Sequence, residues 1–133
     1  MRVSAKTDYA LRAMAELAST EGLLKAERIA NSQGIPLKFL LNIMTELRQQ
    51  GLVASHRGSE GGFRLARPAD EITLADVIRA VQGSLSIVQD VPPGKAVYSG
   101  PAGALRDVWL SLHQVMERML EDITLEDLVR GTT

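Results

Sequence analysis

The residue types best suited to binding a partner lie in one short basic and glycine-rich stretch. Three glycines fall within residues 58–62, and Arg57, Arg64 and His56 flank them. Glycine lets a backbone approach a phosphate or enter a narrow groove, and arginine suits the strong negative potential of a narrow DNA minor groove. A nucleotide phosphate loop would instead need a helix after it, closed by a Lys-Ser or Lys-Thr pair, and here a strand is expected. The stretch therefore favours nucleic-acid binding.

Two short strands, 52–57 and 63–67, are expected on either side of the glycines and form a hairpin with a five-residue tip, 58–62. Three helices are expected before it. Ser4 is a candidate N-cap for a helix that runs to about Ser19. A second helix covers 25–33 and stops at Gly34, and a third opens at Pro36 and ends at Gly51.

Two helices joined by a tight turn that contains glycine are typical of a helix-turn-helix, although any tight helix hairpin favours glycine there. A basic hairpin that follows at once indicates a winged helix. The predicted fold is mainly α with a small β-hairpin wing. The residues expected to face its core are Ala10, Ala13, Met14, Leu17, Ala18, Ile29, Ala30, Leu40, Ile43, Met44 and Leu47.

Two later helices carry the same start signal. Thr73 with Asp76, and Thr124 with Asp127, each place an acidic residue three positions after a threonine N-cap. We interpret the similarity of these two segments as shared capping chemistry and not as a domain repeat.

An apolar stripe begins at Leu105 and keeps helical spacing for five turns. We expect it to pack against a second copy of the chain as a long dimerisation helix. Packing across its own winged helix is the alternative. The stripe consists of Leu105, Val108, Trp109, Leu112, Val115, Met116, Met119, Leu120 and Ile123. The expected organisation is a DNA-binding domain at 1–83, an irregular sensor-type loop at 84–104, and the dimerisation helix with a capped C-terminal turn at 105–133.

Composition removes several classes of function. The 133 residues include no cysteine and only two histidines, so thiolate metal sites, a Cys nucleophile and a His-based triad have little support. No metal site and no enzyme activity are predicted. The formal net charge of −1 divides into +4 for residues 1–67 and −5 for residues 68–133. A basic half suits phosphate, and with neither a membrane span nor a signal peptide expected, the chain is predicted to be cytoplasmic.

Several motifs along the chain belong together. They are SAKTDYALRAM at 4–14, Ile29-Ala30 through Gly34-Ile35-Pro36, RGSEGGFRLARP at 57–68, ITLADVI at 72–78, Trp109 and ITLEDL at 123–128. In these motifs nearly the whole chain resembles the Rrf-two family of bacterial transcriptional regulators. The resemblance implies a homodimeric winged helix-turn-helix in which a long C-terminal helix of each chain crosses to the other.

The resemblance also implies which residues contact DNA. Ser4 and Lys6 would hold backbone phosphate, Asn42 is the best candidate to pair with adenine, and the wing would enter the minor groove. Leu41 stands where some members carry an acidic residue, so the target sequence cannot be copied across, and Phe39 and Leu41 have a packing role as their alternative. The full DNA-binding set is Ser4, Lys6, Lys38, Phe39, Asn42, His56, Arg57, Gly58, Ser59, Gly61, Gly62 and Arg64.

The sensor of the family is where this chain departs from it. Members that bind an iron–sulfur cluster carry its ligands at the places held here by Val91, Val97, Gly103 and Arg106. Those residues cannot replace thiolates, so no iron–sulfur cluster is expected. The resemblance then points to the cluster-free branch, which includes a member that responds through an enzyme of cysteine synthesis. An effector protein or a small molecule at the 84–104 loop remains open, and Tyr98 is either a loop anchor or a ligand contact.

The leading hypothesis is a homodimeric repressor that binds double-stranded DNA at a pseudo-palindromic operator. The alternative is a protein-interaction or small-molecule-sensing module that keeps the winged-helix fold.

Overall fold

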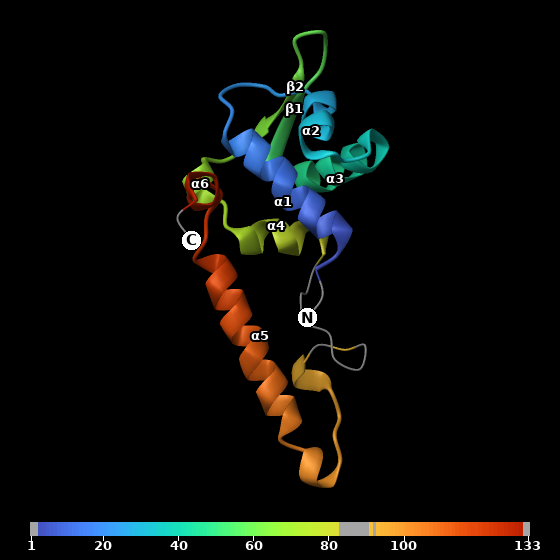
Figure 1. Ribbon diagram of the computed structural model, residues 1–133, viewed down its shortest axis with the longest axis vertical. Coiled ribbons are helices and arrows are strands. Elements are labelled where there is room, and N and C mark those ends of the chain that lie inside the picture. Colours follow the sequence, from blue (N-terminus) through green and yellow to red (C-terminus); the bar gives the residue numbers. More distant parts are fainter. Residues whose placement is uncertain (1–2, 83–90, 92, 132–133) are drawn as a thin grey trace.

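In the computed structural model, which describes residues 3–82, 91 and 93–131, several helices pack together beside a two-stranded hairpin, and one long helix extends from them (Figure 1). This is the mainly α, winged-helix architecture that the sequence predicts. The α-helices are α1 (Ala5–Ala18), α2 (Ala26–Gln33), α3 (Leu37–Gln49), α4 (Leu74–Val81), α5 (Leu105–Glu121) and α6 (Leu125–Arg130). The strands are β1 (Val53–His56) and β2 (Gly62–Leu65), and the 3₁₀ turns are η1 (Ala69–Glu71), η2 (Pro93–Lys95) and η3 (Gly100–Ala102).

The core forms where α1 packs against its neighbours, since α1 contacts α2, α3, α4, α6 and β2. The predicted inward faces are confirmed for α1 to α3, apart from Ala18, which is only partly buried. Met14, Ile29, Leu40 and Leu47 are fully buried, and each removes a large apolar side chain from water. This core holds the helix-turn-helix as one rigid unit.

The ends of the helices follow from local chemistry. The Ser4 hydroxyl accepts a hydrogen bond from the Thr7 amide at 3.1 Å, which confirms Ser4 as the N-cap of α1. Gly34 ends α2 in the left-handed conformation, with φ 65° and ψ 36°. Pro36 lies at the N-cap of α3 and not in its first turn as expected. Its carbonyl still accepts the first helical bond, from the Leu40 amide at 2.9 Å.

The wing pairs β1 with β2 in antiparallel register, from Val53 opposite Leu65 to His56 opposite Gly62. Both strands are shorter than predicted, and the connection is 57–61 instead of 58–62. Gly62 belongs to β2 because it pairs with His56. The next residue, Phe63, also exchanges two backbone hydrogen bonds of 2.8 Å with Leu24.

The two similar capped segments pair with each other. Thr73 lies opposite Thr124 in an antiparallel bridge, with the Leu74 amide donating to the Ile123 carbonyl and the Leu125 amide to the Ile72 carbonyl, both at 2.9 Å. Both predicted capping boxes are confirmed. The bridge returns the chain to the winged helix after α5. It also corrects one expectation, because Ile123 lies beyond the end of α5 and belongs to this bridge.

The segment with η2 and η3 leads away from the winged helix, and α5 brings the chain back to it, with η2 packed against α5 (Figure 1). Within the described residues this segment consists of 91 and 93–104. The rest of the predicted 84–104 loop lies outside them. Among the described helices, none is both long and apolar enough to cross a membrane.

Candidate nucleic-acid interface

The outer face of α3 presents a row of side chains of mixed chemistry. Lys38, Leu41, Asn42 and Thr45 have the spacing i, i+3, i+4 and i+7, and all four are exposed. On the opposite face, Leu40, Ile43, Met44 and Leu47 are buried in the core. The buried face fixes the rotation of α3, so the exposed row has a defined direction. A helix with such a row fits the width of the DNA major groove.

Contacts at both ends hold α3 in place. At the turn before it, the Ile35 amide donates to the Ala30 carbonyl at 3.0 Å. The guanidinium of Arg12 donates to the Gln33 carbonyl at 2.7 Å and ties the end of α2 to α1. Near its far end, Arg48 donates to the Ser55 hydroxyl at 3.2 Å, which connects α3 to the wing. These contacts therefore set the position of α3 relative to the wing.

Phe39 stands on the flank of α3 that faces α1. Its ring meets the Tyr9 ring edge-on, with centroids 5.6 Å apart. The guanidinium of Arg12 lies over the Tyr9 ring, 4.8 Å from its centroid. Phe39 is nevertheless 41% exposed. It packs, as the alternative held, and still leaves part of its ring at the surface.

Lys6 has an intramolecular partner that sequence reasoning missed. Its ammonium lies 2.6 Å from one carboxylate oxygen of Glu46 on α3 and 2.8 Å from the other. The two side chains are 35% and 38% exposed, so the pair lies at the surface. A phosphate that binds Lys6 must compete with Glu46. Forty residues separate the partners, and no local sequence signal connects them.

Ser4 is also engaged. Besides capping α1, its hydroxyl lies 3.0 Å from the Thr7 hydroxyl, which donates to the Gln82 amide oxygen at 2.5 Å. Thr7 is fully buried. This arrangement joins the start of α1 to the end of α4, and a phosphate near Ser4 would meet a preorganised helix N-terminus.

The exposed tip of the wing runs from Arg57 to Glu60, with Arg57, Gly58 and Ser59 open to solvent. Gly58 adopts φ 104°, where residues with a side chain are strained. His56 is exposed at the end of β1, and Arg64 is exposed on β2 with its guanidinium 3.2 Å from the Leu65 carbonyl.

Two predicted tip glycines have structural roles instead. Gly61 is buried, and a Cβ there would lie 2.2 Å from the His56 carbonyl oxygen. Gly62 has φ 152°, and its Cβ would lie 2.8 Å from the Leu24 carbonyl oxygen. Both positions require glycine to close the wing, and Gly62 lies in β2 and not in the 58–62 tip as expected. Arg67, which follows β2, lies 3.6 Å from the Asp76 carboxylate at the start of α4.

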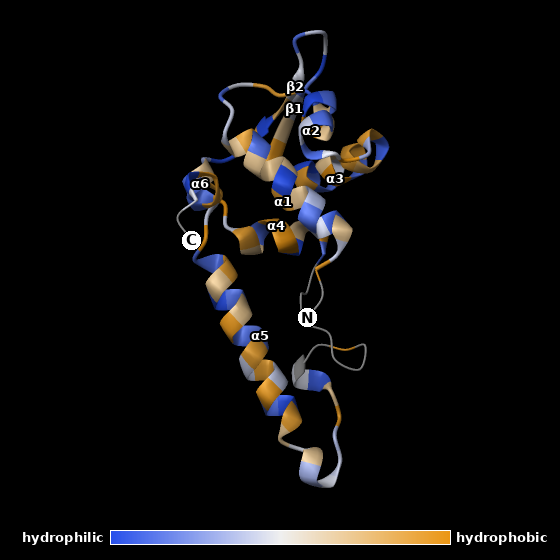
Figure 2. Cartoon of the chain, in the orientation of Figure 1, coloured by the Kyte–Doolittle hydropathy of each residue, from blue (hydrophilic) through white to orange (hydrophobic). Residues whose placement is uncertain are grey.

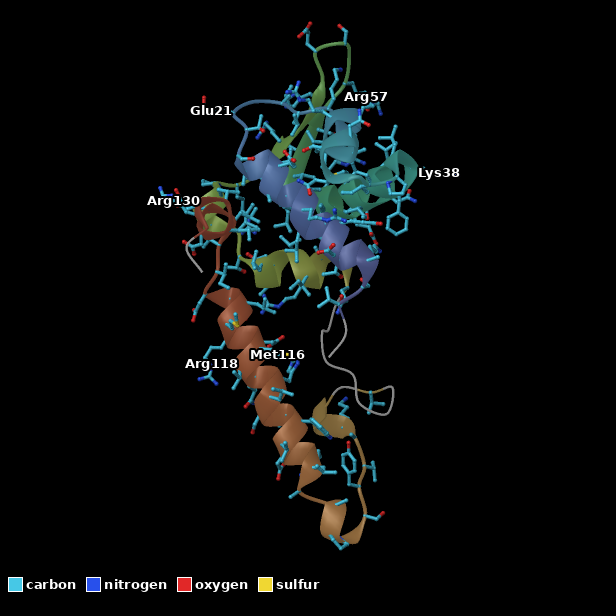
Figure 3. The ribbon with its side chains drawn as sticks, in the orientation of Figure 1. Glu21, Lys38, Arg57, Met116, Arg118 and Arg130 are labelled. Carbon is cyan, nitrogen blue, oxygen red and sulfur yellow. The ribbon has the colours of Figure 1, made fainter. Side chains whose placement is uncertain are left out.

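Lys38 and Arg57 lie at the upper right in Figure 3, whereas Arg130 on α6 lies on the other side of α1. The cations of the wing and of α3 thus share one side of this view. The pKa of the Glu16 carboxylate on α1 is lowered mainly by the hydrogen bond from Ser32 and also by that from Gln33. These bonds fasten α1 to the last turn of α2.

The apolar stripe of α5 divides into two faces. Leu105, Val108, Leu112, Val115 and Met119 are exposed and follow a strict 3–4–3–4 spacing. Figure 2 shows apolar residues recurring between polar ones along this helix. The other predicted members are partly buried, and α5 contacts α4 and η2. These members are Trp109, Met116 and Leu120 on α5, and Ile123 beyond its end.

The second face of α5 lies partly against its own chain. Met116 and Leu120 line a small cavity with Ala75 and Ile78 of α4. The alternative of packing on its own winged helix thus holds for this face. Sequence spacing could not separate the two faces, because both are apolar.

The places where the resemblance puts cluster ligands hold residues without a thiolate. Val97 is 77% exposed, and Arg106 lies 3.7 Å from Asp107 in an ion pair. The chain has no cysteine, and no group of three His, Cys, Asp or Glu side chains gathers at metal-binding distance among the described residues. The residues at the predicted ligand places therefore do not fit an iron–sulfur cluster.

A helix-turn-helix with a basic wing defines a class of DNA-binding protein. The comparisons agree. Residues 3–131 match the model of the Rrf2 family, described as iron-dependent transcriptional regulators, and the chain belongs to this family. It is a DNA-binding transcriptional regulator and not an enzyme.

Relatives and solved structures extend the same assignment. The chain is 49% identical to a Mycobacterium tuberculosis H37Rv protein that is named an HTH-type transcriptional regulator, over 98% of this chain and 83% of that protein. It is 33% identical to the regulator CymR of Bacillus subtilis, over 99% and 92%. The structure of B. subtilis CymR, titled the global cysteine regulator, superposes with a TM-score of 0.84 at 32% identity, covering 100% and 99% of the two chains. The structure of T. potens IscR superposes with a TM-score of 0.81 at 32% identity, covering 100% of this chain and 89% of that chain.

Proposed function

We propose that this regulator is a homodimeric repressor that binds a pseudo-palindromic operator without an iron–sulfur cluster. The exposed row on α3 beside the basic wing carries this proposal. Lys38 and Asn42 lie one turn apart on α3, and both are exposed. Arg57 of the wing lies on the same side of the molecule in Figure 3. A side-chain amide pairs bidentately with adenine, and a cation pairs with guanine or phosphate. The two elements would enter neighbouring grooves.

The exposed face of α5 supports the dimer. Val108, Val115 and Met119 are 53%, 59% and 62% exposed, and such a continuous apolar face needs a partner. The 3–4–3–4 spacing is that of two helices packed along a common seam. A second copy of α5 supplies a face of the same shape, so a two-fold dimer covers both. Two-fold symmetry then requires half-sites separated by about one helical turn, or a multiple of it.

The remaining predicted contacts take supporting positions in this proposal. Ser4, Lys6, His56 and Arg64 would hold phosphate, and Gly58 and Ser59 would bring the tip backbone close to the minor groove floor. Phe39 would add apolar contact beside α3. As phosphate contacts from two copies act together, affinity should fall steeply with salt.

No iron–sulfur cluster is part of the proposed mechanism. The reason is the donor set: valine at the places of two ligands offers no electron pair, and the chain has no thiolate to substitute. The signal would then reach DNA through an effector protein or a small molecule at the 84–104 segment, of which 84–90 and 92 lie outside the described residues. We place the protein in the cytoplasm, where bacterial DNA lies.

The test is fluorescence anisotropy of the purified protein with a labelled duplex of its own promoter region, beside a scrambled duplex, at low and at physiological salt. The expected result is tighter binding to the promoter duplex at both salt concentrations. Equal binding that physiological salt abolishes would count against sequence-specific recognition at that promoter. An absorption spectrum after anaerobic preparation should be featureless in the visible range, and charge-transfer bands would refute the cluster-free proposal.

A further inference from the structure

The exposed row on α3 contains one side chain that no polar contact with DNA explains. Leu41 is 42% exposed, and it lies between Lys38 and Asn42 along the row. Leu37, one turn earlier on the same flank, is 39% exposed. An apolar side chain at this place cannot donate to or accept from a base edge. It would leave base polar groups without partners wherever it covered them.

Thr45, the polar neighbour of Leu41 on this flank, already donates a hydrogen bond within the helix. The Thr45 hydroxyl donates to the Leu41 carbonyl at 2.9 Å, inside the helix. Its proton is therefore not offered to a base. Leu41 and Thr45, one turn apart, form a weakly polar strip next to the Asn42 amide. The other flank of α3 differs, because Phe39 packs on Tyr9 there and Glu46 binds Lys6.

Only one base carries an apolar group on its major-groove edge. Thymine has a C5 methyl, whereas guanine, cytosine and adenine present only donors and acceptors. A leucine that contacts this methyl buries apolar surface on both sides and leaves no base group unpaired. Because Leu41 and Asn42 are successive residues, they would contact base pairs that are neighbours in the duplex.

We infer that Leu41 is a specificity-determining residue that selects thymine by contact with its C5 methyl group, next to the adenine that Asn42 contacts. The inference rests on the proposed function, since it requires α3 to lie in the major groove. It deepens that function by naming the base and the atom that are recognised.

The experiment removes the methyl group alone. The purified wild-type chain first selects its preferred duplex from a pool with a randomised centre. The thymines of the selected duplex are then replaced by deoxyuridine, one symmetry-related pair at a time. Deoxyuridine differs from thymidine only by the absence of that methyl group. The affinities of the wild type, Leu41→Ala and Val129→Ala are measured on every duplex. Val129 on α6 is 40% exposed and serves as the matched control for loss of surface apolar volume.

One symmetry-related pair of thymines should be sensitive to the change. Loss of one buried methyl lowers a binding constant by about fourfold, so the two half-sites together give about fifteenfold. Leu41→Ala should bind the thymine and deoxyuridine duplexes equally, as a double-mutant cycle requires for a direct contact. Val129→Ala should keep the wild-type difference. Thermal unfolding of each variant checks that it is folded.

Two results would overturn the inference. If no thymine is sensitive to loss of its methyl, or if Leu41→Ala keeps the full wild-type sensitivity, Leu41 does not select thymine. In both cases the chain still selects a sequence, and the proposed function stands. A chain that selects no sequence at all would overturn the proposed function and this inference with it.

Discussion

Arg57 provides the sharpest test of the wing. Arg57 is exposed at the start of the tip and has no part in the buried core. The change Arg57→Ala therefore removes a surface cation without removing a core contact. The fold and the proposed dimer should therefore stay intact. In the proposed complex each of two copies places this arginine in the minor groove against phosphate-rich surroundings, where its charge releases condensed counterions.

The expected size of the effect follows from the number of cations removed. Each phosphate neutralised adds about 0.9 to the slope of log affinity against log salt, so loss of Arg57 from two copies should reduce that slope by about 1.8. Between 50 and 200 mM salt, the wild type should then lose about twelvefold more affinity than the variant does.

The assay is a salt series of anisotropy titrations with one operator duplex. Arg130→Ala is the matched control: it also removes one surface arginine, but from α6, where Arg130 pairs with Glu126 at 2.9 Å. Its slope should equal that of the wild type. If Arg57→Ala and Arg130→Ala gave the same slope, the wing would have no place in the mechanism.

Four further predictions concern other contacts. Glu46→Gln should free Lys6 from its 2.6 Å ion pair and raise affinity for any duplex severalfold at low salt, as measured by anisotropy; unchanged affinity would mean that Lys6 does not contact DNA. Glu16→Gln should lower the free energy of unfolding near pH 7. Because hydrogen bonds depress the native pKa of Glu16 below its ordinary 4.5, this loss should vanish as pH falls through the depressed value, and a loss that grew in acid would refute the assignment. Thr124→Ala should cost about 1 kcal/mol in chemical denaturation through loss of the α6 cap, and no change would contradict the capping role. Val115→Glu should convert the dimer to monomers in light scattering, and an unchanged mass would place the dimer contact elsewhere.

Short-range features of this fold could be predicted from the sequence because their causes lie within a few residues. The threonine caps at Thr73 and Thr124 each need only a carboxylate three residues later, and both boxes form. Gly34 ends α2 because glycine, having no side chain, adopts the left-handed conformation at little cost. The buried faces of α1 to α3 followed from helical periodicity in the same way.

Long-range features could not be predicted. The ion pair of Lys6 with Glu46 and the bridge between Leu24 and Phe63 join segments about 40 residues apart. The close approach of Leu24 explains why position 62 needs glycine, since a Cβ there would lie 2.8 Å from the Leu24 carbonyl oxygen, and local spacing does not reveal it. Likewise, the two capped segments were recognised as similar, but their pairing at Thr73 and Thr124 depends on how α5 returns the chain.

The central claim is that two copies of α3, paired through α5, recognise a two-fold DNA site. Selection from a randomised duplex pool by the wild-type chain, followed by sequencing of the bound fraction, tests it most directly. The account predicts an inverted repeat whose half-sites are centred about 10 base pairs apart, or a multiple of that spacing, with an adenine and a thymine next to each other in each half. Enrichment of a single unpaired half-site, or of no sequence, would contradict it.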